Sequence, residues 1–291
     1  MSTNPPPGTS GDVDSQDIFD RRARRIRRNR IAPDYPAHDF LRAVMLDGIA
    51  ERLDAVTRDF TEILDVGSFT GDLTVPGARI ARCDAGRAFA RAAHGVQADE
   101  DGLPFADAAF DAAISAGVLD QVNDLPGALS LIRRTLRPDG LFLGAFLGGG
   151  SLSTLRAVLR EAEEDRPVAR LHPQVDVRAA GDLMVRAGFA LPVADVETVT
   201  VRYADLGKLL TDLRGMGAAN LLRGRSAMSR ATLARAFAAF AARADTDGRT
   251  SERFDIVFLT GWAPAASQPK PARRGSGTTS LADVLKRFPA P

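Results

Sequence analysis

Short apolar segments alternate with helical segments over the central part of the chain, and this alternation constrains the fold more than any other feature. We expect strands at residues 62–67, 78–84, 95–99, 110–119 and 140–148, and helices at residues 85–95 and 123–140. Strand and helix repeated in this way require a parallel sheet with right-handed crossovers. The sequence therefore predicts an α/β fold with a doubly wound sheet and helices on both faces.

The second half of the chain extends the same pattern. We expect helices at residues 151–165 and 176–189, and the last two strands at residues 195–203 and 253–262. Two more helices, at residues 205–217 and 229–245, stand where a simple domain of this class would have only a hairpin. The prediction is a mostly parallel, seven-stranded sheet with a helical insertion, about residues 205–246, before the last strand.

Composition changes at both ends of the chain. Residues 1–17 and 264–291 are rich in Pro, Gly and Ser, and such segments bury too little apolar surface to fold by themselves. We expect a disordered N-terminus at residues 1–17, one domain over residues 18–263 and a flexible tail at residues 264–291.

The overall composition is that of an ordinary soluble protein. The 291 residues include 38 basic and 37 acidic side chains, and this balance implies no specific nucleic-acid partner. The single Cys83 excludes an intramolecular disulfide framework and fits a reducing compartment. No apolar run is long enough to span a bilayer, and the N-terminus lacks the apolar core of a signal peptide. These features favour a cytoplasmic location, with peripheral membrane association left open.

An arginine-rich segment follows the disordered N-terminus. The sequence "IFDRRARRIRRNR" places seven arginines between Arg21 and Arg30. One interpretation is a solvated helix whose apolar minority, Ile18, Phe19 and Ile26, packs on the domain. The other is a docking site for an acidic partner or a membrane surface.

Chemistry-bearing residues stand where the first two predicted strands end. In open parallel sheets, ligands bind outside the carboxyl ends of the strands. Asp65 would orient the turn after the first strand, and Gly67 and Gly71 would let the backbone approach a ligand. Asp84 ends the second strand, where an acidic side chain can accept hydrogen bonds from both hydroxyls of a ribose.

The next two strands end in further candidates. Asp99 and Glu100 follow the third strand, near an expected adenine edge, and Ser115 in the fourth strand would face the reacting end of the ligand. Together with the turn, this arrangement resembles the cofactor site of class I methyltransferases, which have a Rossmann-like fold and use S-adenosylmethionine. The alternative is that the acids only cap strand ends.

Several motifs outside the turn resemble a more particular family. The chain carries "IFDR" at residues 18–21, "DGLPF" at 101–105, "VNDLPGAL" at 122–129, "LRPDG" at 136–140 and "DLRGMG" at 212–217, followed by "GW" and "RRGS". In order and spacing these motifs are similar to the methyltransferase-like complex I assembly factors of mitochondria and alphaproteobacteria. The resemblance covers residues 18–284.

The resemblance implies two different activities. The wider superfamily, including the malonyl-carrier-protein methyltransferases of biotin synthesis, transfers a methyl group from S-adenosylmethionine. The assembly-factor branch binds that cofactor while supporting hydroxylation of an arginine in a subunit of NADH:ubiquinone oxidoreductase. A protein substrate or a respiratory complex subunit is the implied partner.

The departures from the family concern the cofactor. Phe69 puts a ring where the family has a glycine or another small residue, and Pro76 limits the helix that should follow the turn to a single turn, residues 72–75. Asp120 and Gln121 stand where the family usually has a His-Trp pair. The resemblance implies S-adenosylmethionine as the cofactor, and these departures leave open whether its binding is retained, weakened or lost.

The sequence identifies no catalytic residue and gives no support for a metal site, because its three histidines are scattered. Three hypotheses stay open. The first is an S-adenosylmethionine-dependent methyltransferase-like protein that acts on or with a protein partner in complex I assembly. The others are a catalytically degenerate scaffold with the same fold and an S-adenosylmethionine-binding assembly factor of the arginine hydroxylase type.

Overall fold

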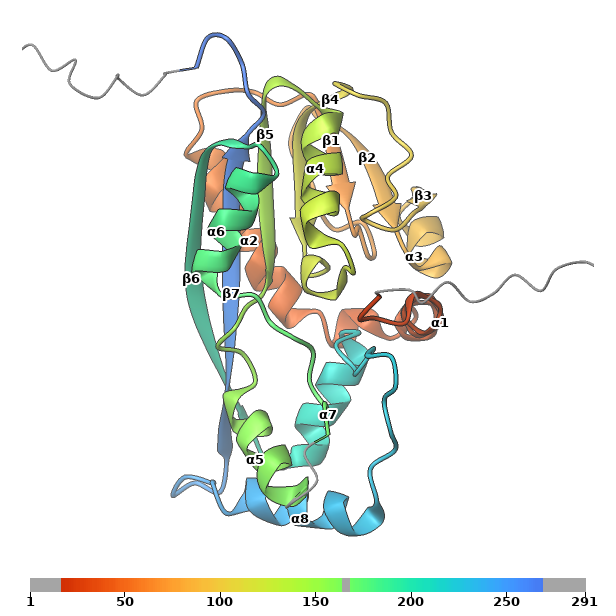
Figure 1. Cartoon of the computed structure of the whole chain (residues 1–291), viewed down its shortest axis with the longest axis vertical. Coiled ribbons are helices and arrows are strands. Elements are labelled where there is room, and N and C mark those ends of the chain that lie inside the picture. The colour runs from red at the N-terminus through yellow and green to blue at the C-terminus, as the bar shows by residue number, and fades with distance from the viewer. Residues whose placement is uncertain (1–16, 164–167, 269–291) are drawn as a thin grey trace, which may run out of the picture.

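A computed structural model describes residues 17–163 and 168–268 (Figure 1). The disordered N-terminus and the flexible tail expected from composition fall almost entirely at residues 1–16 and 269–291, which lie outside the described residues.

The described chain contains one seven-stranded sheet with the order β3-β2-β1-β4-β5-β7-β6. The first five strands pair in parallel, and β7 runs antiparallel to both β5 and β6. The strands are β1 Glu62–Val66, β2 Arg79–Asp84, β3 Val96–Gln97, β4 Phe110–Ala116, β5 Leu136–Leu147, β6 Ala190–Tyr203 and β7 Thr250–Trp262. The predicted mostly parallel, seven-stranded α/β fold is confirmed.

Apolar side chains of β1 and β5 point alternately to the two faces of the sheet, and each face has its own core. On one face, α2 (Phe40–Asp54) packs Met45 and Ile49 against the sheet. On the other, α4 (Leu125–Thr135) and α6 (Val177–Arg186) contribute Leu129, Ile132 and Met184. The short α3 (Arg87–Ala92) follows β2.

Three helices form a separate layer below the parallel strands. β6 and β7 are long and extend past the rest of the sheet, and α5 (Ser153–Glu163), α7 (Leu206–Gly215) and α8 (Arg230–Ala241) pack near this extension (Figure 1). α7 and α8 are the two inserted helices between β6 and β7 that the sequence predicted.

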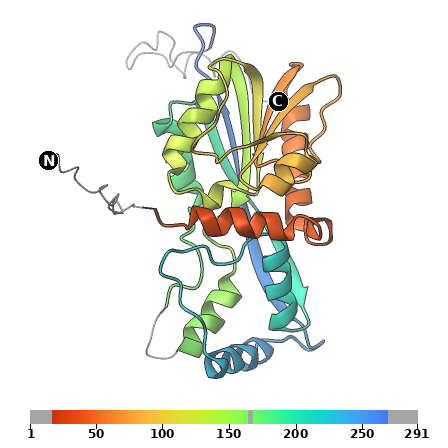
Figure 2. The same ribbon diagram turned by 90° about the vertical axis from the view of Figure 1, so that its right-hand side faces the viewer.

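The arginine-rich helix α1 (Arg21–Ile31) lies between the two layers. It runs across the molecule beneath the carboxyl edge of the parallel strands (Figure 2). Asp20 caps its N-terminus by accepting a hydrogen bond from the backbone N–H of Ala23. The position of α1 decides how the candidate site is built.

The chain between β1 and β2 contains no helix, which is within the expected limit of at most one helical turn at residues 72–75, because Pro76 has no N–H to donate and the connection is short. One local prediction was wrong. Helix α4 ends at Thr135 rather than at residues 138–140. Pro138 disfavours helical geometry in the residue before it, so this segment joins β5 instead.

Within the described residues, no helix is both long and apolar enough to cross a membrane.

Candidate functional site at the carboxyl edge of the sheet

The turn after β1 depends on two glycines. Gly67 and Gly71 have φ values of 78° and 84°, in the left-handed region that glycine adopts without a steric penalty. A Cβ atom on Gly67 would lie 2.5 Å from the Cγ atoms of Val118. The space beside this glycine is therefore filled by the protein's own side chain.

Asp65 lies inside the molecule, behind this turn. It is fully buried, and neither of its carboxylate oxygens accepts a hydrogen bond from any residue that the structure describes. Loss of hydration raises the pKa of Asp65 to about 6, although the positive charges of Arg42 and Arg82 oppose the shift. The Ser68 Oγ atom is also buried without a described partner. The turn thus covers a polar cluster whose hydrogen bonding is incomplete.

Asp84, at the end of β2, is the candidate ribose ligand, and its carboxylate already has four donors. The guanidinium of Arg28 donates from Nε to Oδ1 at 2.8 Å and from Nη2 to Oδ2. The backbone N–H groups of Phe69 and Gly86 donate at 3.1 and 2.7 Å. A carboxylate offers about four acceptor positions, so those of Asp84 are filled in this arrangement.

The acidic residues after β3 are paired in the same way with α1. Arg24 donates to both oxygens of Glu100 at 2.6 and 2.7 Å, and both side chains are buried. Arg21 donates to both oxygens of Asp101 at 2.6 and 2.7 Å.

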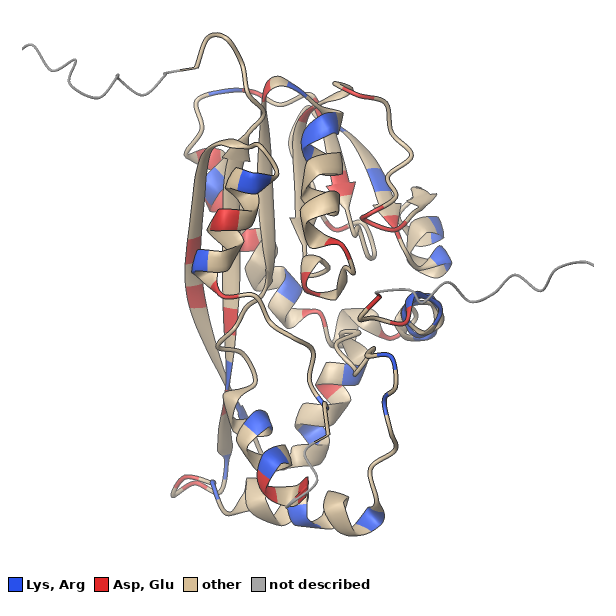
Figure 3. Ribbon diagram, viewed as in Figure 1, with Lys and Arg blue, Asp and Glu red and all other residues tan. Residues whose placement is uncertain are grey.

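Asp99 completes this interface by accepting a hydrogen bond from Arg25. Figure 3 shows α1 end-on, with its basic residues beside the acidic segments at this edge of the sheet. Every acidic residue that the sequence proposed as a ligand of the ribose or the adenine is therefore bound to an arginine of α1.

Phe69 turns into the protein and builds an aromatic cluster. Its ring stacks on Tyr35 with centroids 4.6 Å apart and meets Phe89 edge-on at 5.3 Å. The guanidinium carbon of Arg28 lies 4.1 Å from the centroid of the Phe69 ring. The arginine that pairs with Asp84 is therefore also held by a cation–π contact.

Ser115 is buried in β4, and its hydroxyl donates a hydrogen bond to the backbone oxygen of Val66 at 3.0 Å. This bond braces β4 against β1. In this structure the Ser115 hydroxyl therefore makes a hydrogen bond within the sheet and not with a ligand.

Little space is left beside these residues. A cavity of about 30 Å³ is lined by Tyr35, Arg42, Phe69 and Asp120 among others, and one of about 10 Å³ borders Arg24 and Glu100. Ligand sites are typically about 300–1,000 Å³ in volume. The residues at this edge, as arranged here, do not fit S-adenosylmethionine, because the acids are paired and the space is filled.

Asp120 lies between two cavities of about 30 Å³, one of which it shares with His172. Burial raises the pKa of Asp120 to about 6. His172 accepts a hydrogen bond at Nε2 from the backbone N–H of Leu221 at 2.8 Å and contacts Phe19 edge-on. These contacts favour a structural role for His172 over a role in binding a substrate.

Throughout the described residues, the histidine, cysteine and acidic side chains nowhere gather in threes in a way that could hold a metal ion.

The sheet order, the antiparallel β7 and the acid-glycine turn after β1 define a class I methyltransferase fold. Residues 64–144 match the family described as "Methyltransferase domain". A crystal structure from Bacillus halodurans, assigned as a methyltransferase, superposes with a TM-score of 0.53 at 13% identity and covers 74% of this chain and 98% of its own. At this identity, the likeness supports the fold alone.

Sequence relatives are closer. Arginine-hydroxylase NDUFAF5, mitochondrial, from Danio rerio is 33% identical over 288 residues, or 92% of this chain and 90% of that protein. The malonyl-[acyl-carrier protein] O-methyltransferase of Laribacter hongkongensis is 31% identical over 292 residues, or 91% and 96%. The chain belongs to the methyltransferase-fold family that contains these two kinds of protein.

The pairing between α1 and the acids was missed at the sequence level. The signal was present, because residues three or four apart on a helix share a face, and Arg21, Arg24, Arg25 and Arg28 have that spacing. Neither interpretation weighed for this segment, a solvated face or an external docking site, assigned these arginines to the protein's own acidic residues.

Proposed function

We propose that this chain is a methyltransferase-like assembly factor that works by binding a protein partner in respiratory complex I assembly, without methyl transfer from S-adenosylmethionine. The observation that carries the proposal is the pair of buried bidentate contacts, Arg28 with Asp84 and Arg24 with Glu100. The partner assignment is supported by the identity to NDUFAF5 over nearly the whole length of both chains.

The energetics of these contacts argue against the cofactor. Removing one partner of a buried ion pair typically costs about 3–5 kcal/mol, because the other charge stays buried and unpaired. Ribose hydroxyls would replace charged guanidinium donors with neutral ones, which make weaker hydrogen bonds to a carboxylate. A bound cofactor would therefore have to displace α1 at a large cost.

A second candidate function is supported by the polar cluster behind the turn. The Asp65 oxygens, the Ser68 Oγ and the Arg42 Nε are buried without described partners, and buried polar atoms in native proteins are usually satisfied. In a second conformation, with α1 moved away from the sheet edge, a bound ligand would provide hydrogen-bond partners for these buried atoms. In that case Gly67, Gly71, Asp84, Asp99 and Glu100 would line a cofactor site as the sequence proposed.

We further infer that the protein is located in the cytoplasm of a bacterium. It would bind its partner there in solution or at the membrane surface. The inference rests on the sequence argument and on the respiratory partner proposed above.

Isothermal titration with S-adenosylmethionine and with S-adenosylhomocysteine separates the two candidates. We expect no heat of binding for either ligand at millimolar concentration. Affinity in the micromolar range would overturn the first candidate and support the second.

The partner is tested by tagging the full chain in its own organism and identifying the proteins that co-purify. Complex I subunits or assembly intermediates are expected. Their absence, in cells whose complex I content falls when the chain is deleted, would contradict a direct binding role.

A further inference from the structure

A cavity of about 480 Å³ lies away from the carboxyl edge, among α5, α7, α8 and the chain segment between α7 and α8. Helix α1 borders it only through Arg27. Its volume falls within the usual range for small-molecule sites, about 300–1,000 Å³. None of the residues proposed for the cofactor lines this cavity.

The wall of the cavity is mostly apolar. Leucines of three helices, among them Leu155, Leu210 and Leu213, line it together with several alanines, and Met228 adds a flexible side chain. Polar groups other than arginines are limited to Asn220 and Ser226 among the side chains that line it. Such a wall accepts an apolar chain and offers few partners for a polar backbone.

The charged residues of the lining are all arginines: Arg27, Arg170, Arg214 and Arg225. Three of them have acceptors. Arg27 donates to the backbone oxygen of Asn220, Arg170 pairs with Glu163, and Arg225 pairs with Asp20.

Arg214 is different. It is exposed at the end of α7, and among the described residues no acceptor is recorded for its guanidinium. The arginines that line this cavity repel one another: burial and the charge of Arg225 lower the pKa of Arg27. An added anion would relieve this repulsion.

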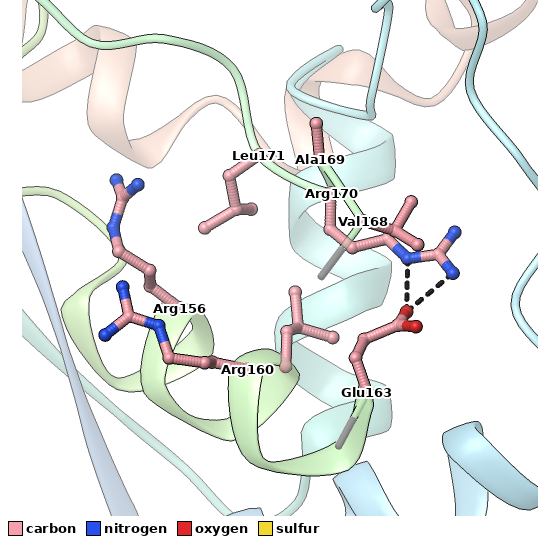
Figure 4. A pocket seen from close by; sticks show the side chains of 8 residues that line it. Arg156, Arg160, Glu163, Val168, Ala169, Arg170 and Leu171 are labelled. Carbon is pink, nitrogen blue, oxygen red and sulfur yellow. Dashed lines mark hydrogen bonds and ion pairs between the residues drawn. The ribbon is translucent and has the colours of Figure 1, made fainter. Parts of the chain in front are cut away.

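A second hollow of about 210 Å³ adjoins the cavity and shares Leu159, Arg170 and Leu171 with it. Figure 4 shows the guanidinium groups of Arg156 and Arg160 together on one side, while Arg170 turns to Glu163. The surroundings of the cavity are therefore also basic.

We propose that the cavity among α5, α7 and α8 binds a linear acyl chain that ends in a carboxylate or phosphate group. The apolar wall would hold the chain, and the planar guanidinium of Arg214 would bind the anionic end. A peptide segment fits less well, because its buried N–H and C=O groups each need a partner and the leucine wall provides none. The proposal does not depend on the function proposed above.

Titration of the full-length protein with dodecanoate, dodecyl phosphate and dodecanol tests the proposal. We expect both anions to bind and dodecanol to bind at least about tenfold more weakly, a difference of about 1.4 kcal/mol. Stronger binding of one anion would identify the head group. Equal binding of dodecanol, or no binding of either anion, would overturn the proposal.

Two variants locate the site. Arg214→Ala should weaken dodecanoate about tenfold, and the matched control Arg91→Ala, an exposed arginine of α3, should not. Leu210→Trp should fill the cavity and abolish binding, with circular dichroism used to verify the fold. If Arg214→Ala leaves affinity unchanged, the ligand binds elsewhere and the proposal fails; binding of acidic amphipathic peptides alone would also overturn it.

Discussion

Arg28 and Asp84 form a buried ion pair that ties the N-terminal helix to the end of strand β2. The guanidinium contacts both carboxylate oxygens and lies over the ring of Phe69. The two residues are 56 positions apart in the chain, so the pair forms only when α1 docks on the assembled sheet. Asp84, which the sequence proposed as a ribose ligand, therefore forms an internal ion pair in this structure.

The first prediction concerns the stability that this pair contributes. Arg28→Ala leaves Asp84 buried with only its two backbone donors and also removes the contact with Phe69. We expect a loss of about 3–5 kcal/mol in the free energy of unfolding, as for other broken buried pairs. Urea denaturation followed by circular dichroism measures it.

The control is on the same helix. Arg22 is exposed, and Arg22→Ala should change stability by less than about 0.5 kcal/mol. A loss below about 1 kcal/mol for Arg28→Ala would mean that α1 is not anchored through Asp84.

The second prediction concerns Phe69. Its φ of 47° is left-handed, a conformation that costs a non-glycine residue roughly 1–2 kcal/mol, while its buried ring contacts Tyr35 and Phe89. Phe69→Ala keeps most of the backbone strain and loses the ring, so it should destabilise by about 3–5 kcal/mol.

Phe69→Gly separates the two effects. It also loses the ring but relieves the strain, so it should be about 1 kcal/mol more stable than Phe69→Ala. Chemical denaturation of the two variants side by side provides the comparison. A glycine variant less stable than the alanine variant would show that the left-handed backbone carries no strain here.

The fold could be predicted from the sequence because its signals are local. Each of the segments around Leu64, Ile114 and Phe142 is apolar by itself, and a helix signal such as Asp124 before Pro126 needs only neighbouring residues. The end of α4 at Thr135 was not predicted, because Pro138 overrode the helical pattern there.

The candidate site could be predicted only in part. Strand ends located Asp65, Asp84 and Glu100 at one edge, but the state of these side chains depends on contacts across long stretches of chain. Arg24 and Glu100 are 76 residues apart, and no local pattern shows that one will neutralise the other. Phe69 was recognised as an obstacle, yet its stacking on Tyr35 depends on where the 3-10 turn after α1, Tyr35–Ala37, packs in the folded chain.

A third prediction follows from the raised pKa of Asp65. Burial raises this pKa from 3.8 to about 6, so between these values the folded protein holds a proton that the unfolded chain has lost. Stability due to this group therefore decreases as pH rises through the window. Asp65→Asn removes the penalty and should stabilise the protein by about 2–3 kcal/mol near pH 8.

The gain should vanish at about pH 3, below both pKa values, where the wild-type carboxyl is protonated in both states. Thermal melts of wild type and variant across this pH range measure the difference. A gain that does not depend on pH would show that packing or hydrogen bonding, and not ionisation, distinguishes the two side chains.

The fourth prediction has the opposite sign and concerns His172. Burial and the charge of Arg27 lower the pKa of His172 from 6.5 to about 4, and its neutral ring accepts a hydrogen bond from the Leu221 N–H. Between these values the unfolded chain binds a proton that the folded protein does not. The stability due to this group is present above the unfolded pKa and is lost as pH falls through the window.

His172→Gln can keep an acceptor for the Leu221 N–H but cannot bind the proton. Relative to wild type, the variant should gain stability by about 2–3 kcal/mol as the pH is lowered from about 7 to about 4. Urea titrations at a series of pH values test this, with His94→Gln as the control because His94 is exposed. If both variants follow the same pH profile, His172 is not a buried neutral acceptor for the Leu221 N–H.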